Sequence, residues 1–366
     1  MIQQARGVGL RVLHVMAGAR VGGAEAFFER LLPALARAGL EQRAVIRRHA
    51  ARAARLEAAG VPVVELAFGQ RLDFATRPAL RREVRAFRPD LVLGWMSRAA
   101  RLFPLGEIPH VARLGGYYDL KYYRGCDHLI GNTPDLVDDF LCRGWPRQRA
   151  HYLPNFVTAE RMPPLERSEL ATPAGAPLLL GLGRLHRDKG FDLLLGALQK
   201  LPDAWLWLAG EGPETRRLGR LAAELSVASR ARFLGWRDDV PALMAAAQVV
   251  VAPSRREPFG NVVVEAWAQG RPVVAAAAVG PRALIDHGET GLLVPLEDRD
   301  ALAEAVRRLL GDPALAARLA GGGAAAYEAE FTEQAVVQRY LGLFERLTGV
   351  PAPGTRSAAA SREGLH

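Results

Sequence analysis

Short apolar runs rich in β-branched residues alternate with amphipathic helical segments along most of the chain. The first run, Arg11–Met16, is followed by a glycine-containing turn and then by a helical pattern over about 24–38, with apolar residues three and four positions apart. Parallel strands need a crossover of about a dozen residues, which a helix supplies. The alternation therefore predicts an α/β protein with a parallel sheet.

The chain contains two such series, and 366 residues exceed the size at which one hydrophobic core keeps growing. Between the series, the sequence gathers Pro, Ser, Thr and Gly, which is typical of a linker. We predict an N-terminal domain at 1–165, a linker at 166–177, a second domain at 178–331, a closing helix at 332–348 and a disordered tail at 349–366. The strand candidates after the first are 42–46, 61–66, 91–95, 110–114, 128–131, 178–181, 205–209, 231–234, 249–252, 273–276 and 291–294.

Composition narrows the class of protein. No uninterrupted apolar run approaches the roughly 18 to 20 residues of a membrane-spanning helix, and the N-terminus does not resemble a signal peptide. The two cysteines, Cys126 and Cys142, lack the spacing of a metal site and are expected to be free thiols. We therefore expect a cytoplasmic protein.

The charge is uneven, because residues 1–165 carry 25 Lys+Arg against 15 Asp+Glu, whereas the remainder carries 23 against 24. Anionic lipid or an acidic acceptor would explain a basic first half, but so would an arginine-rich composition without function. No nucleic-acid reading motif accompanies the charge, so nucleic acid is not an expected partner. The helical pattern at 73–87 could lie against anionic headgroups at the inner face of the plasma membrane, through Arg77, Arg81, Arg82 and Arg85.

The strongest chemical signal is a pair of glutamates after the strand candidate at 249–252. Glu257 lies in a loop that Gly260 loosens, and Asn261 is well placed to cap the following helix, whose first N–H groups suit a phosphate. Glu265 lies one to two turns into that helix, where a carboxylate can accept hydrogen bonds from ribose hydroxyls. Taken singly, each glutamate also fits a helix-capping acid or an exposed helix charge.

Two cations flank the turn that follows the strand candidate at 178–181. Arg184 and Lys189 lie five positions apart between Gly183 and Gly190, beside an expected helix N-terminus. Arginine offers phosphate oxygens a planar fork and lysine a mobile point charge. The pair is suited to stabilising the charge that develops on a leaving diphosphate.

Several motifs together resemble the GT-B retaining glycosyltransferases of family four, over roughly residues 10 to 347. These motifs are Gly22–Glu25, Leu153–Asn155, Gly183–Leu185 with Lys189–Gly190, Ala209–Pro213, Glu257–Gly260 with Glu265, and Ile285–Gly291. The resemblance implies two Rossmann-like domains that face each other across a cleft, with a C-terminal helix crossing back to the first domain. It implies a hexose-type transfer from a UDP-, GDP- or ADP-sugar with retention of configuration, commonly without a metal or other cofactor.

Position by position, the resemblance implies that Arg184, Lys189 and Glu257 are the catalytic residues. The two cations bind the donor diphosphate, and Glu257 contacts the transferred sugar. It implies that Glu265 binds the ribose. The other donor-binding residues implied are Phe259, Gly260 and Asn261 through their backbone, and Gly22 and Gly23, which let the first domain approach the phosphates.

The chain departs from this family at the first-domain histidine, whose usual position falls near Gly115. No general base is therefore assigned, which a front-face mechanism tolerates because the leaving phosphate takes the acceptor proton. His110 comes too early and is expected at the surface, at the start of a strand. Candidate acceptor contacts are Arg113, Tyr117 and Asp119, which fit equally well as loop charges and packing groups.

We expect a glycan or glycolipid acceptor, in lipopolysaccharide or other cell-envelope polysaccharide synthesis. Two alternatives share the fold: a nucleotide-sugar epimerase, which would need acid–base groups on both sides of the sugar, and a binding module that has lost catalysis. A basic nucleic-acid-binding protein is a further alternative, which the missing reading motif disfavours.

Overall fold

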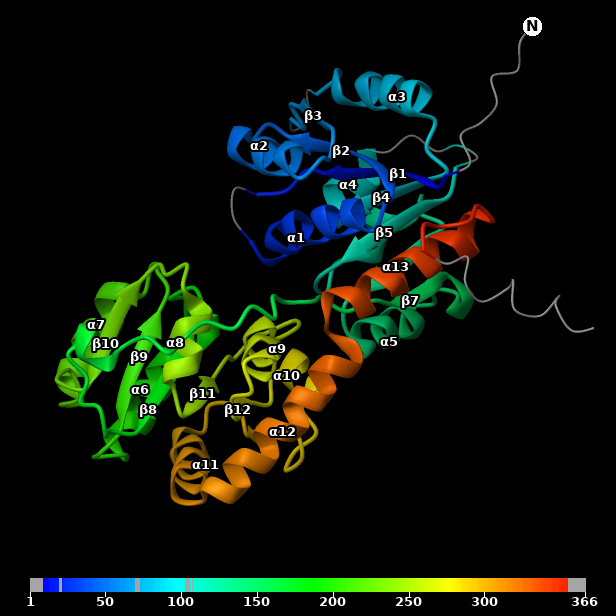
Figure 1. Ribbon diagram of the computed structural model, residues 1–366. Coiled ribbons are helices and arrows are strands. Elements are labelled where there is room, and N and C mark those ends of the chain that lie inside the picture. Colours follow the sequence, from blue (N-terminus) through cyan, green and yellow to red (C-terminus); the bar gives the residue numbers. More distant parts are fainter. Residues whose placement is uncertain (1–8, 20–21, 70–72, 103–105, 107, 355–366) are drawn as a thin grey trace, which may run out of the picture. The chain divides into compact units, whose positions relative to one another are not determined.

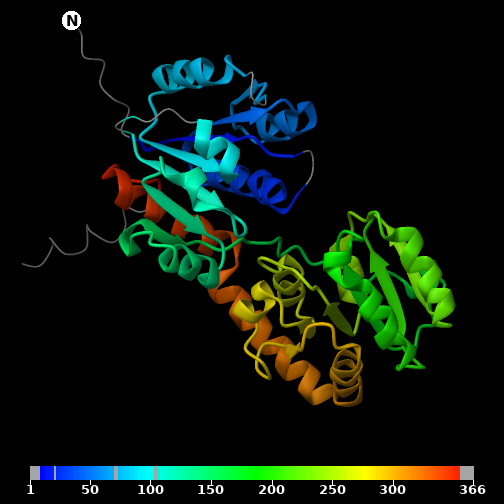
Figure 2. The ribbon, with the colours of Figure 1, turned by 180° about the vertical axis from the view of Figure 1, so that it is seen from behind.

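The computed structural model describes residues 9–19, 22–69, 73–102, 106 and 108–354. The chain divides into two compact units: unit 1 comprises Met1–Asn155 with Glu333–His366, and unit 2 comprises Phe156–Thr332. Each unit contains a parallel sheet flanked by helices (Figures 1 and 2). The prediction of two Rossmann-like domains is therefore confirmed.

Unit 1 contains a seven-stranded sheet in the order β3-β2-β1-β4-β5-β6-β7, with every pair parallel. Five of the six predicted strands have both ends within one residue of the observed ends. The sixth, β3, begins two residues later than predicted. The short edge strand β7 was not predicted, because three residues show no periodicity. The elements are β1 (Arg11–Met16), α1 (Gly23–Arg37), β2 (Glu41–Arg47), α2 (Ala50–Ala58), β3 (Val63–Leu66), α3 (Thr76–Phe87), β4 (Leu91–Trp95), α4 (Met96–Leu102), β5 (His110–Leu114), η1 (Leu120–Tyr123), β6 (His128–Gly131), α5 (Pro134–Cys142), η2 (Arg147–Arg149), β7 (Ala150–Tyr152) and α13 (Glu333–Thr348).

Unit 2 contains a six-stranded parallel sheet in the order β10-β9-β8-β11-β12-β13. In both units the order reverses beside the first strand, and loops at the carboxyl edge of such a reversal are where open α/β sheets bind ligands. The elements are η3 (Arg167–Leu170), β8 (Leu178–Leu182), η4 (Arg187–Lys189), α6 (Phe191–Gln199), β9 (Trp205–Ala209), α7 (Thr215–Glu224), β10 (Ala231–Gly235), α8 (Val240–Ala246), β11 (Val249–Ala252), α9 (Asn261–Ala268), β12 (Val273–Ala276), α10 (Val279–Leu284), β13 (Leu292–Val294), α11 (Arg299–Gly311) and α12 (Pro313–Glu330).

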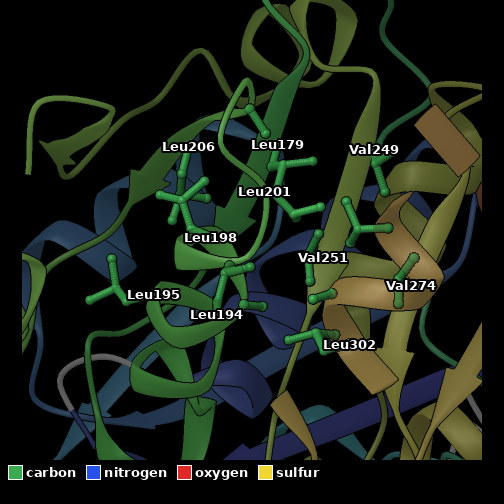
Figure 3. Packing of buried hydrophobic residues seen from close by; sticks show 14 of the residues in the cluster. Leu179, Leu194, Leu195, Leu198, Leu201, Leu206, Val249, Val251, Val274 and Leu302 are labelled. Carbon is green, nitrogen blue, oxygen red and sulfur yellow. The ribbon is translucent and has the colours of Figure 1, made fainter. Parts of the chain in front are cut away.

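Both faces of the unit 2 sheet are buried, which explains why its strands are almost continuously apolar. Successive residues of a strand point to opposite faces. Leu179 packs with α6, α7 and α11 on one face, where Leu194 and Leu302 meet Val251 (Figure 3). Leu178 and Leu180 pack on the other face, with α8 and α9.

The predicted linker is part of unit 2, and the boundary falls after Asn155 instead of after 165. Arg167 donates hydrogen bonds to the carbonyls of Ala174, Ala176 and Ala246, and Thr172 accepts one from the indole of Trp207 at 2.9 Å. These side-chain contacts hold irregular backbone against the sheet. Composition does not reveal such contacts, so the segment resembled a free connection.

The C-terminal helix α13 belongs to unit 1, as predicted, and packs against α1 and β4. The predicted disordered tail is wrong at its start, because Ala352 is buried and Pro353 lies beside Gly39. Residues 355–366 of that tail lie outside the described residues. Among the helices of the described ranges, none is both long and apolar enough to cross a membrane.

Candidate functional site

The predicted donor residues of unit 2 lie in loops at the carboxyl edge of its sheet. The loop after β8 runs against the loop after β9 through two backbone hydrogen bonds, from Gly183 N to Ala209 O (3.0 Å) and from Leu185 N to Glu211 O (2.9 Å). Gly210 makes this approach possible, since a Cβ there would lie 2.0 Å from the Gly183 carbonyl oxygen. The loops therefore form a close-packed rim.

Lys189 and Glu257 converge on this rim. Nζ of Lys189 lies 2.5 Å from Oε2 of Glu257, and the two side chains are only 26% and 15% exposed. Lys189 ends η4, whereas Glu257 lies in the loop between β11 and α9. Both line a small pocket with Ser254, Gly260 and Pro281. The resemblance implied that both side chains contact the donor, but their direct ion pair was not predicted from the sequence.

Backbone contacts fix the two loops that carry this pair. The amides of Arg255 and Arg256 donate to the carbonyl of Asp188 at 2.8 and 3.2 Å. Gly190 has φ +66° and presses against the loop, because a Cβ there would lie 2.1 Å from the Pro253 carbonyl oxygen. Glycine is required at this position both by its conformation and by the space available.

Two helices begin at the site without a side-chain cap: Gly190 precedes α6 and Gly260 precedes α9. The prediction that Asn261 caps α9 is wrong, because Asn261 is the first helical residue. Gly260 occupies the cap position with φ +105°, a left-handed conformation that asparagine adopts less readily than glycine. A helix start whose N–H groups no side chain caps favours an anion.

The other predicted donor residues of unit 2 differ in exposure. Arg184 is exposed and forms no hydrogen bond or ion pair through its side chain within the described part of the chain. Glu265 lies half-buried in α9. The Phe259 ring is buried, 6.3 Å from the Phe331 ring, so only its backbone is available to a ligand.

In unit 1, Gly22 precedes α1 and Gly23 is its first residue. The buried carboxylate of Glu25 folds back over this turn and accepts a hydrogen bond from Ala19 N at 2.7 Å. A Cβ at Gly22 would lie 2.3 Å from Oε2 of Glu25, so a larger residue there would displace this carboxylate. The donor-binding role of Gly22 and Gly23 stays a prediction.

Arg113 is a core residue of unit 1, which counts against its predicted contact with an acceptor. It is 2% exposed, donates from Nε to the Tyr340 hydroxyl at 2.9 Å and donates from Nη2 to Oδ1 of Asn155. Its guanidinium also stacks over Phe27 and Trp95. The sequence did not predict that Arg113 is buried, because the residues that bond its side chain, Tyr340 and Asn155, come from distant segments.

Among the other unit 1 candidates, Asp119 caps η1 by accepting from Lys121 N at 3.0 Å, and it pairs with the Lys121 ammonium at 2.6 Å. This contact fits its reading as a loop charge. Tyr117 is 43% exposed. The expected surface position of His110 is wrong, because the side chain is buried and burial lowers its pKa to about 4. It does begin a strand, as predicted.

Comparisons with known proteins relate both units to glycosyltransferases. Residues 176–312 match the family model described as Glycosyl transferases group 1, and residues 21–161 match Glycosyltransferase Family 4. The chain is 37% identical to the lipopolysaccharide core biosynthesis glycosyltransferase LpsD of Rhizobium meliloti (strain 1021), over 92% of this chain and 98% of that protein. It is 36% identical to LpsE of the same organism, over 91% and 98% of the two chains. The solved structure of Anabaena Alr3699/HepE in complex with UDP has the same fold, with a TM-score of 0.81 at 22% identity over 92% of this chain and 100% of that one.

Proposed function

Because the chain belongs to the glycosyl transferases group 1, family 4, and is a glycosyltransferase, we propose that it moves a hexose-type sugar from a nucleotide diphosphate donor with retention of configuration. The observation that carries the proposal is the convergence of Lys189 and Glu257 beside the uncapped start of α9. A cation and a helix N-terminus suit a diphosphate, and a carboxylate suits sugar hydroxyls. UDP is a reasonable first donor nucleotide, since the structural neighbour HepE is described in complex with it.

In the proposed reaction, the bond between the sugar C1 and the diphosphate oxygen breaks while C1 bonds to an acceptor oxygen on the same face. The acceptor proton passes to the leaving diphosphate. Lys189 and Arg184 then stabilise the negative charge that develops on the leaving group. Because these cations supply the charge, the proposed reaction needs no further cofactor.

Within the site, we assign the ribose to Glu265 and the transferred sugar to Glu257. The half-buried position of Glu265 in α9 supports the assignment, since a carboxylate partly shielded from water forms stronger hydrogen bonds with hydroxyls. The amides of Gly260 and Asn261 would meet phosphate or sugar at the helix start.

The proposed acceptor is a lipopolysaccharide core or a related cell-envelope glycan, because LpsD and LpsE are described as lipopolysaccharide core enzymes. We place the reaction in the cytoplasm, with peripheral contact to an anionic membrane. Helix α3 supports this contact. Phe74 precedes it and is 80% exposed, and Arg81 and Arg85 find no carboxylate partner among the described residues. An exposed ring beside a helix with exposed arginines suits a headgroup layer.

A donor screen tests the proposal. The protein is mixed with UDP-, GDP- and ADP-hexoses and a delipidated core oligosaccharide, and nucleotide diphosphate release and the anomeric configuration of the product are followed. Transfer of the sugar with retained anomeric configuration supports the proposal, whereas a product of inverted configuration overturns its stereochemical part. An epimerised free donor, or binding without turnover, favours the alternatives. Cosedimentation with phosphatidylglycerol and phosphatidylcholine vesicles tests the membrane contact separately.

A further inference from the structure

The guanidinium of Arg255 ties three segments of unit 2 together. It forms two hydrogen bonds with the Asp192 carboxylate, at 2.7 and 2.8 Å, and two with Glu297, at 2.5 and 3.0 Å. Nη1 also donates to the carbonyl of Arg187 at 3.0 Å. Paired forks of this kind fix geometry more tightly than a single contact does.

These contacts reach both loops of the candidate site. Arg255 lies two residues before Glu257. Its guanidinium donates to the Arg187 carbonyl, and the backbone amides of Arg255 and Arg256 donate to the carbonyl of Asp188, just before Lys189. The two carbonyls that precede Lys189 are therefore held by the loop that carries Glu257.

The ion pair between Arg255 and Glu297 forms although the backbone of Glu297 is strained. Glu297 has φ +61°, a left-handed conformation that is unfavourable for a residue with a side chain. Only Arg255 bonds its carboxylate among the described residues. Conformations of this kind persist where the surrounding contacts over-determine them and often mark functional sites.

We infer that Arg255 is a positioning residue, which fixes the Lys189 turn against the Glu257 loop and so holds the Lys189 ammonium in place for the diphosphate. The inference rests on the proposed donor site, but it assigns a role to a residue outside the motifs that define that site. Its partners Asp192 and Glu297 are 63 and 42 residues away in the sequence, so no local pattern reveals it.

A double-mutant cycle tests the inference, with Arg255→Met, Lys189→Ala and the combined variant. Affinity for UDP, ADP and GDP is measured by calorimetry. We expect Arg255→Met to weaken binding about tenfold in the wild type and less than twofold in the Lys189→Ala background, because the effect passes through Lys189. Equal losses in both backgrounds overturn the inference. Arg255→Lys should rescue only partly, because an ammonium has three N–H donors, whereas the Arg255 guanidinium forms five side-chain hydrogen bonds in a planar fork.

Arg307→Met is the matched control, since Arg307 also bonds a carboxylate (Glu304) and a backbone carbonyl (Lys200), but on an exposed face of α11. We expect unchanged nucleotide affinity in this variant.

Hydrogen exchange without ligand separates failure of the inference from failure of the proposed function. Arg255→Met should accelerate exchange in 187–190 and 253–257 and leave the strands of the sheet unchanged. Unaltered exchange in those loops overturns the inference even if no nucleotide binds the wild type, and absence of nucleotide binding counts against the proposed function alone.

Discussion

The Lys189 ammonium and the Glu257 carboxylate form an ion pair at 2.5 Å across 68 residues of sequence. Both charges are partly withdrawn from water, so their attraction is stronger than that of an exposed pair. A diphosphate that binds Lys189 must therefore compete with Glu257. Glu257 thus pairs with the ammonium that a phosphate would otherwise bind, and it is also a candidate contact for the transferred sugar.

Replacing Lys189 by alanine is expected to reduce turnover by on the order of 10²-fold, because a preorganised charge on the leaving group is lost. The measurement is kcat with saturating nucleotide sugar. Unchanged turnover would contradict the assignment.

Glu257→Gln is expected to have effects of opposite sign on two quantities. The affinity for free nucleotide diphosphate rises several-fold, because the competing carboxylate is gone, while turnover falls as the sugar contact weakens. Glu304→Gln, the same change on an exposed side chain of α11, should alter neither. Weaker nucleotide binding in Glu257→Gln would argue against competition within the pair.

Glu265→Ala should weaken donor binding by roughly 10- to 100-fold, which corresponds to the 1.5–3 kcal/mol typical of hydrogen bonds to charged groups. A 2′,3′-dideoxynucleotide diphosphate provides the control. It should bind the wild type and the variant with similar affinity, since it lacks the hydroxyls that the carboxylate would contact. A loss that persists with this analogue would place Glu265 elsewhere in the site.

Gly190→Ala should destabilise the protein by at least about 2 kcal/mol, because the new Cβ would meet the Pro253 carbonyl oxygen at 2.1 Å and φ is +66°. Gly219→Ala is the matched control in the interior of α7, where a Cβ meets no atom within 4 Å. That variant should gain up to about 1 kcal/mol from helix propensity. Urea unfolding measures both, and equal effects would show that the Gly190 turn relaxes.

Acid should destabilise unit 1 through His14, whose pKa burial lowers to about 3. The unfolded chain binds the proton near pH 6.5 and the folded chain does not, so stability falls as pH decreases below 6.5. Between pH 6.5 and 5 this amounts to about 2 kcal/mol. His14→Leu should remove that share of the pH dependence, measured by urea unfolding at pH 7 and pH 5. An unaltered pH dependence would mean that His14 is protonated in the folded state.

Much of the fold could be predicted from periodicity, since Leu91–Trp95 and Val249–Ala252 are strands with the predicted bounds. Local rules were less successful where a segment's partners lie far away in the sequence. The predicted linker is held by Arg167 and Thr172, and the apolar strand that carries Arg113 gave no sign that distant Tyr340 and Asn155 bond its guanidinium. The unit boundary and the burial of Arg113 were therefore missed.

Local spacing and backbone conformation were sufficient to predict the two α/β series, the glycine turns and the residue types of the candidate donor site. The folded chain was needed to show that Lys189 pairs with Glu257, that Gly260 instead of Asn261 occupies the cap position of α9, and that Arg255 joins the loops. These contacts form because parallel strands bring together loops that are tens of residues apart in the sequence. Charges in such loops interact over distances of a few ångströms, and these distances cannot be read from spacing along the chain.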